Sequence, residues 1–222
     1  AILFDLIVID SKIIKIGQFP SIADLVIPEI SKYKSVLGKQ YREFSKAVGL
    51  FAHGIGIGSF VYLRRIIEKL VFDKYNELAE KLDILKEDFE RQKFDKKIET
   101  LKEYLPASLV KNKNVYGIVS KGIHELSEEE CREMFPYIRI GIELILDDLL
   151  AEKERKEKEK VFDMFYTGGS RSSDSRRSLG LGLALCRSII TSHGGTISVS
   201  DNIPNGTVVS FTLPIGEVDL NE

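Results

Sequence analysis

Two glycines near the carboxyl end of the chain have the spacing of a phosphate-binding turn. Gly180 and Gly182 lie within residues 178–184, directly before an apolar-periodic stretch. Glycine has no side chain to keep a ligand from the backbone, and the first amides of a helix are unpaired donors that attract anions. The preceding Gly/Ser-rich loop adds arginines that can pair with phosphate oxygens, namely Arg171, Arg176 and Arg177. The pattern predicts a phosphate site beneath a lid. The alternative is that the glycines serve packing and the arginines lie in a solvated loop.

A helix and two strands are expected to position this site. Apolar residues recur at helical spacing as far as Ser192, and His193-Gly-Gly195 supplies a glycine for a left-handed helix end. Residues 196–200 alternate like a half-buried strand, and Asn205-Gly206 is a strong hairpin signal before a returning strand at residues 207–213.

The motifs of this tail also follow one another in a characteristic order. Phe162-Asp-Met-Phe165 precedes the lid and the glycine pair, and Gly206-Thr207 and Leu213-Pro214 close the segment. This order resembles the C-terminal end of the ATP-binding domain of sensor histidine kinases, which has the GHKL ATPase fold. It is most similar to that of the potassium-responsive sensor kinases.

The resemblance implies a role for each matching residue. Gly180 and Gly182 would contact the triphosphate, Leu181 and Ala184 would support the site, and Thr207 would lie near the adenine. It also implies ATP and magnesium as cofactors, phosphotransfer to a histidine, and a response regulator as partner.

Several elements that such a kinase needs do not occur before Phe162. The chain has no Asp-x-Gly-x-Gly string and no asparagine helix for magnesium, and neither His53 nor His124 is followed by an acceptor-type sequence. We therefore expect an incomplete α/β sandwich that is not active by itself and that leaves a sheet edge and an apolar face exposed.

Composition divides the chain near Lys160. Residues 1–160 contain 28 Lys+Arg and 28 Asp+Glu, whereas residues 161–222 contain 4 and 6. Residues 151–160 alternate in charge sign, which favours a solvated helical linker. The expected domains are a mainly helical part at 1–150, this linker at 151–160 and the ATPase-like tail at 161–222.

The first part is predicted to be helical behind a small β-hairpin, so the whole chain is assigned to the α+β class. The hairpin is expected from the β-branched runs within residues 6–16. Helical periodicity runs over residues 33–51, 60–85 and 126–149, and Pro136 is expected to kink or split the last helix.

Two weaker candidate sites lie in the first part. Ile55-Gly-Ile-Gly-Ser59 opens a helix that carries Arg64 and Arg65, so its amides could bind an anion. The alternative is a close-packed turn with solvated or paired arginines. His124, expected in a loop, is a candidate general acid or base, or else a local hydrogen-bonding residue.

Residues 17–150 also resemble, loosely, the helical HEPN-like domains of bacterial defence systems. The match rests on residues 62–70, the Leu105-Pro106 break and the Lys121-Gly-Ile-His124 turn. It implies an interaction or RNA-related module that carries a passenger kinase tail. Because no arginine lies within six residues of His124, a non-catalytic role is the preferred form of this alternative.

The remaining features narrow the class of protein. Net charge is −2, which gives no electrostatic argument for a general nucleic-acid binder. Cys131 and Cys186 support neither a disulfide framework nor a zinc site. No apolar run is long enough for a membrane span, so a cytoplasmic location is expected, with homodimerisation possible. The first residue, Ala1, indicates a fragment or a processed chain. The abrupt change near Lys160 favours a joining event over a divergent kinase, and a truncation, a natural fusion and an artificial joining stay open.

Overall fold

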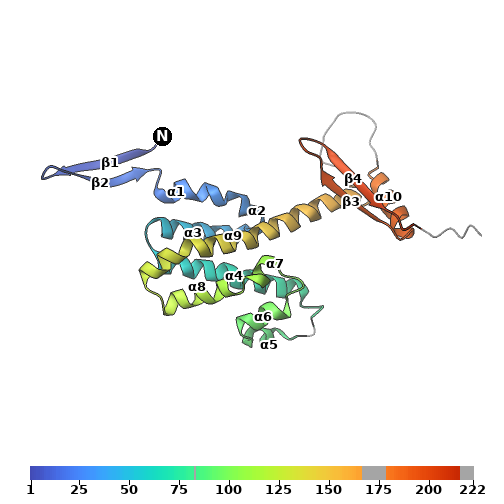
Figure 1. Ribbon diagram of the computed structural model, residues 1–222, viewed down its shortest axis with the longest axis horizontal. Helices are drawn as coiled ribbons and strands as arrows, with labels where there is room; N and C mark the ends of the chain where they lie inside the picture. The colour runs from blue at the N-terminus through green and yellow to red at the C-terminus, as the bar shows by residue number, and fades with distance from the viewer. Residues whose placement is uncertain (83, 167–178, 216–222) are drawn as a thin grey trace, which may run out of the picture. The chain divides into compact units, whose positions relative to one another are not determined.

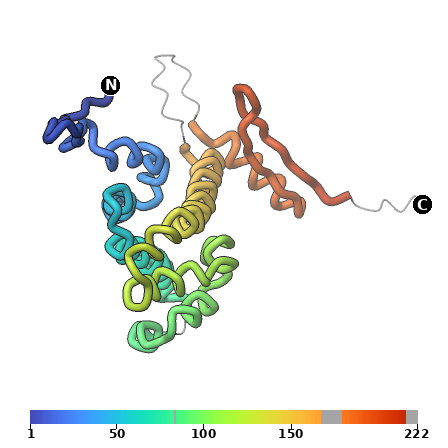
Figure 2. Tube along the Cα trace, turned by 60° about the vertical axis from the view of Figure 1, so that its left-hand side comes forward, coloured from blue at the N-terminus to red at the C-terminus, as the bar shows by residue number. Residues whose placement is uncertain are grey.

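The computed structural model describes residues 1–82, 84–166 and 179–215. The chain divides into two compact units, Ala1–Leu150 and Ala151–Glu222, which are described separately below. Both units are coloured along the chain in Figures 1 and 2. Among the described residues, no helix is both long and apolar enough to cross a membrane.

The first unit opens with the expected β-hairpin. Strands β1 (Leu3–Ile9) and β2 (Lys12–Phe19) pair antiparallel. Asp10 and Ser11 join them with φ of 47° and 62°, the left-handed conformation that two-residue hairpin turns need. The apolar side chains of both strands are exposed, so the hairpin contributes little to the core of this unit.

A broken helical segment follows, where the sequence predicted one helix over residues 33–51. It consists of short elements before the longer α3: α1 (Ile22–Val26), η1 (Ile27–Tyr33), α2 (Lys34–Leu37), η2 (Gly38–Gln40) and α3 (Tyr41–Ala52). Gly38 has a φ of +52°, which a continuous right-handed helix does not allow. The regular helix therefore starts only at Tyr41.

The core of this unit lies among α3, α4 (Gly56–Leu78), α8 (Asn114–His124) and the first half of α9 (Glu128–Glu159). Figures 1 and 2 show α3, α4 and α8 side by side. Gly122 of α8 lies so close to α4 that a Cβ there would stand 2.1 Å from the Phe60 ring. Glycine thus sets the distance between these two helices.

Three short helices connect α4 to α8. They are α5 (Lys86–Arg91), α6 (Phe94–Thr100) and α7 (Ala107–Lys111). The sequence predicted one helix as far as Leu85, but α4 ends at Leu78. The apolar periodicity continues beyond the helix because Leu82 still packs on the core. The break predicted at Pro106 is present, directly before α7.

In the sequence, Ser127 followed by three glutamates at residues 128–130 predicts a helix start, and helix α9 begins there. The Glu130 amide donates to Ser127 Oγ (3.2 Å), and the Ser127 amide donates to the Glu130 carboxylate (2.8 Å). This capping box satisfies two amides that the helix leaves unpaired. Pro136 is exposed and lies inside the helix, which continues on both sides of it, so the predicted split does not occur.

The second unit contains the end of α9, η3 (Lys160–Phe162), α10 (Gly182–Ser192) and a hairpin. Strands β3 (Thr196–Asp201) and β4 (Thr207–Thr212) pair antiparallel from Thr196↔Thr212 to Asp201↔Thr207. Helix, glycine end and hairpin all match the sequence prediction. Gly194, with a φ of +73°, ends α10 in the left-handed conformation.

Candidate nucleotide site

The predicted phosphate turn lies at the start of α10, where Gly180 brings two backbone segments together. The Phe165 amide donates to the Gly180 carbonyl at 3.1 Å. Gly180 has a φ of +65°, and a Cβ there would stand 2.6 Å from the Tyr166 carbonyl oxygen. This glycine is therefore required by the fold itself, whatever ligand the turn holds.

Gly182 has a different environment from Gly180. It is the first residue of α10, and a Cβ there would meet no atom of the described residues within 4 Å. Leu181, the preceding residue, caps the helix with no side-chain hydrogen bond. The amides of the first turn, including that of the half-buried Ala184, have no acceptor within the helix, and such amides can bind an anion.

The other residues that the sequence predicted to bind the nucleotide make no described contact with this turn. Thr207 is exposed and pairs with Asp201 at the far end of the β3–β4 register. Within the described ranges, no hydrogen bond joins Thr207 to the glycine pair. Arg171, Arg176 and Arg177 lie outside the described residues.

The end of α9 contacts β3, and the following η3 contacts α10. The sequence did not reveal either contact. Lys158 Nζ lies 2.7 Å from Asp201 Oδ2, and this hydrogen bond raises the pKa of Lys158. Phe162 is 5% exposed, and the Arg187 guanidinium lies 5.7 Å from its ring centroid. The charged segment that the sequence predicted to be solvated therefore contacts the strand pair along one side.

Large apolar side chains of this unit remain exposed. They lie on α10 and on the strands, and they include Leu185 (58%), Ile189 (59%), Val209 (44%) and Phe211 (62%). Only two strands pair in the described part of this unit, so the hairpin has unpaired edges. This exposure agrees with the expectation drawn from the missing elements.

Magnesium is the metal that the family resemblance implies. The described residues include no group of three or more His, Cys, Asp or Glu side chains that could hold a metal. Magnesium is normally held through carboxylates together with the substrate phosphates.

The second predicted anion site, at the start of α4, is already filled by the protein itself. The amides of Gly56 and Ile57 both donate to the Glu128 carboxylate, the latter at 3.2 Å. Arg64 pairs with Glu68 at 2.8 Å, and Arg65 is also ion-paired. The alternative of a packed turn with paired arginines is therefore correct.

His124 is the last residue of α8, where the sequence predicted a loop, and it is exposed. It lines a shallow depression of about 330 Å³ together with Asp95, Ser120, Lys121 and Glu125. Nothing in this geometry assigns it a reaction, and a catalytic role for His124 stays a prediction.

Comparison with known proteins identifies the tail. Residues 140–217 match the family described as "Histidine kinase-, DNA gyrase B-, and HSP90-like ATPase". The match begins inside α9, ahead of Phe162. No solved structure matches the chain.

The curated relatives are sensor proteins. The chain is 48% identical to the sensor protein KdpD of Clostridium acetobutylicum over 54 residues, which is 24% of this chain and 6% of the relative. It is 32% identical to the sensor protein TdiS of Thauera aromatica over 110 residues, 46% of this chain and 19% of the relative. It is 38% identical to the sensor histidine kinase WalK of Bacillus subtilis over 63 residues, 28% of this chain and 10% of the relative.

Residues 140–217 are thus part of a histidine-kinase-type ATPase domain of the GHKL α/β fold, and sensor histidine kinases are homologues of this chain. The resemblance that the sequence showed and the α+β class are both confirmed. The chain spans only 6% to 19% of the length of the three relatives named above. These comparisons give no support to the HEPN-like resemblance or to a fusion.

Proposed function

We propose that this chain is a sensor histidine kinase-like part of a two-component phosphorelay, and that its tail supplies the phosphate-contacting end of an ATP site. The open first turn of α10 at Gly182 carries this proposal, because unpaired amides at a helix start bind phosphate. Members of this ATPase family bind ATP. Gly180, Leu181, Ala184, Thr207, Arg176 and Arg177 are proposed to complete this end of the site.

We further propose that the chain does not transfer phosphate by itself. It lacks the Asp-x-Gly-x-Gly string and an acceptor-type histidine sequence. Residues 1–150 form the helical domain, 151–160 the charged linker and 161–222 the ATPase part in this proposal. As part of the same proposal, the chain has a response regulator as its partner, forms a homodimer and is located in the cytoplasm.

A nucleotide titration of the isotope-labelled full chain tests the first proposal. Addition of ATP with magnesium should shift the amide signals of residues 182–184, and only at millimolar nucleotide. Gly182→Val should abolish these shifts, because the added side chain hinders approach of the phosphate to the first-turn amides, while its Cβ meets no atom of the described residues within 4 Å. Ser188→Val, at an exposed position of the same helix, is the matched control and should leave them unchanged.

Two results would contradict these proposals. Unchanged signals at residues 182–184 in saturating ATP would exclude the phosphate site. Incorporation of acid-labile phosphate from radiolabelled ATP into the isolated chain would show that it is active by itself.

A further inference from the structure

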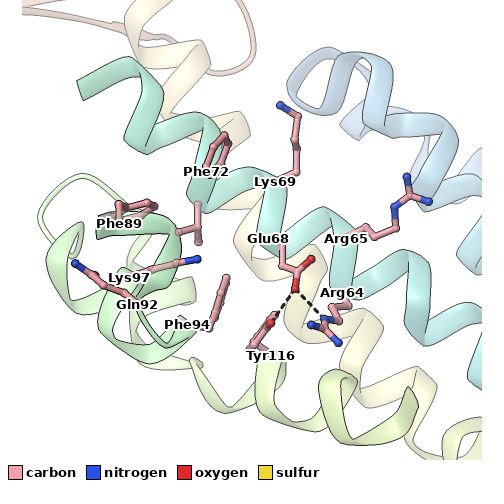
Figure 3. A pocket seen from close by; sticks show the side chains of 11 residues that line it. Arg64, Arg65, Glu68, Lys69, Phe72, Phe89, Gln92, Phe94, Lys97 and Tyr116 are labelled. Atoms are coloured by element: carbon pink, nitrogen blue, oxygen red, sulfur yellow. Dashed lines mark hydrogen bonds and ion pairs between the residues drawn. The ribbon is translucent and has the colours of Figure 1, made fainter. Parts of the chain in front are cut away.

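A second cavity lies in the helical unit, away from any residue assigned to the nucleotide. It has a volume of about 530 Å³ and lies between α4 and the short helices α5 and α6, with Tyr116 of α8 at one side. Figure 3 shows its lining, a mixture of aromatic rings and cationic side chains. Small-molecule sites typically have volumes of roughly 300–1,000 Å³.

The one carboxylate in this lining is held by two donors. Glu68 Oε1 accepts from Arg64 Nε and from Tyr116 Oη, each at 2.8 Å (Figure 3). Burial raises the pKa of Tyr116, and the hydrogen bond to Glu68 raises it further, so the hydroxyl remains a neutral donor. The charge of Glu68 is therefore balanced and does not repel an anionic ligand.

Lys97 is the cation of this cavity that no carboxylate neutralises. Arg65 pairs with Glu43 at 3.1 Å, and Lys69 pairs with Asp73. Across the described residues, Lys97 has no such ion pair, and its ammonium lies 5.6 Å from the centroid of an aromatic ring. An uncompensated ammonium inside a cavity attracts an anion.

Flat aromatic side chains form the walls around Lys97. Phe94 stacks on Tyr116, with the ring centroids 3.6 Å apart and the planes 19° apart. The ring beneath Lys97 is Phe89, which stacks on Tyr75 at 4.1 Å and 11°. Phe89 is fully buried and only supports Lys97 from below, whereas the half-buried Phe94, fixed by Tyr116, can offer its ring to a planar ligand at little entropic cost.

We propose that this cavity binds a small molecule in which a flat aromatic ring carries an anionic group, with Lys97 holding the anion and the half-buried Phe94 contacting the ring. The site is independent of the proposed ATP site, because all its residues belong to the helical unit. Nucleotides and aromatic carboxylates share this chemistry.

Isothermal calorimetry on the full chain distinguishes these two sources. Adenosine monophosphate and benzoate are titrated separately, each beside its uncharged counterpart, adenosine or benzamide. We expect one of the two anions to bind and its uncharged counterpart to bind at least about tenfold more weakly, the usual effect of losing a charge-assisted hydrogen bond.

Matched variants place the anion at Lys97. Lys97→Met keeps the aliphatic stem and should weaken binding about tenfold. Lys96→Met, at an exposed position of the same helix, should have no effect. Lys97→Met should leave the ATP-induced shifts of residues 182–184 unchanged, which separates this site from the phosphate turn of the tail.

The proposal is wrong if neither anion releases heat at millimolar concentration. It is also wrong if the uncharged counterparts bind equally well, or if Lys97→Met and Lys96→Met give the same affinity while both retain the helical circular dichroism of the parent chain.

Discussion

At the scale of single residues, Glu128 shows how one side chain can serve two helices. It lies in the first turn of α9 and accepts the amides of Gly56 and Ile57 at the start of α4. A carboxylate is favoured at the positive end of a helix dipole, and here two such ends meet. Because Glu128 is 72 positions from Gly56, no local sequence pattern could reveal this contact.

Replacing Glu128 should therefore reduce stability. Glu128→Ala leaves two half-buried amides without their acceptor, and we expect a loss of about 2 kcal/mol in the free energy of unfolding. Urea denaturation followed by circular dichroism measures this loss.

Glu133→Ala is the matched control, because Glu133 is an exposed residue of the same helix. It should change stability by less than about 0.5 kcal/mol. Equal effects of the two substitutions would show that Glu128 does not cap α4.

At the scale of elements, close contact between α4 and α8 depends on glycine. Gly122 faces Phe60, whereas Gly117, five residues earlier on α8, has no atom within 4 Å of its ideal Cβ. Periodicity predicted α4 from its apolar residues, but it could not show which glycines are needed for packing. That distinction depends on the partner helix, which only the tertiary structure provides.

The two glycines should respond oppositely to alanine. Gly122→Ala forces a methyl group into the Phe60 ring and should lower the free energy of unfolding by at least about 1–3 kcal/mol. Gly117→Ala should stabilise the protein by about 0.5–1 kcal/mol, because alanine loses less backbone entropy in a helix. Thermal unfolding of both variants tests this, and similar melting temperatures would contradict the packing argument.

At the scale of the whole molecule, the two units differ in how much they bury. The first unit holds a continuous core around residues such as Phe44, Ile67 and Ile142. Phe162 is the only buried hydrophobic residue in the described part of the second unit. The second unit therefore gains little hydrophobic stabilisation from its own residues.

The reactivity of the two cysteines measures this difference in burial between the units. Cys131 is buried in the first unit, and burial raises the pKa of its thiol, which lowers the reactive thiolate fraction. Cys186 lies exposed on α10. Iodoacetamide at pH 8 should alkylate Cys186 at least about a hundredfold faster than Cys131, as measured by mass spectrometry of the peptides.

Unfolding should remove this protection of Cys131. In concentrated urea both cysteines should react at similar rates, because neither is then buried. Comparable rates without urea would show that the helical core opens readily in the native state.

The sequence alone determined the fold class, both hairpins, the Ser127 cap and the ATPase resemblance of the tail. Each of these depends on neighbouring residues: a turn dipeptide, a capping box, or motifs in a fixed order. The tertiary structure decided what occupies the start of α4, which glycine is open to a ligand, and that Lys97 and Tyr116 share a cavity. These features depend on residues far apart in the chain, and only packing brings such residues together.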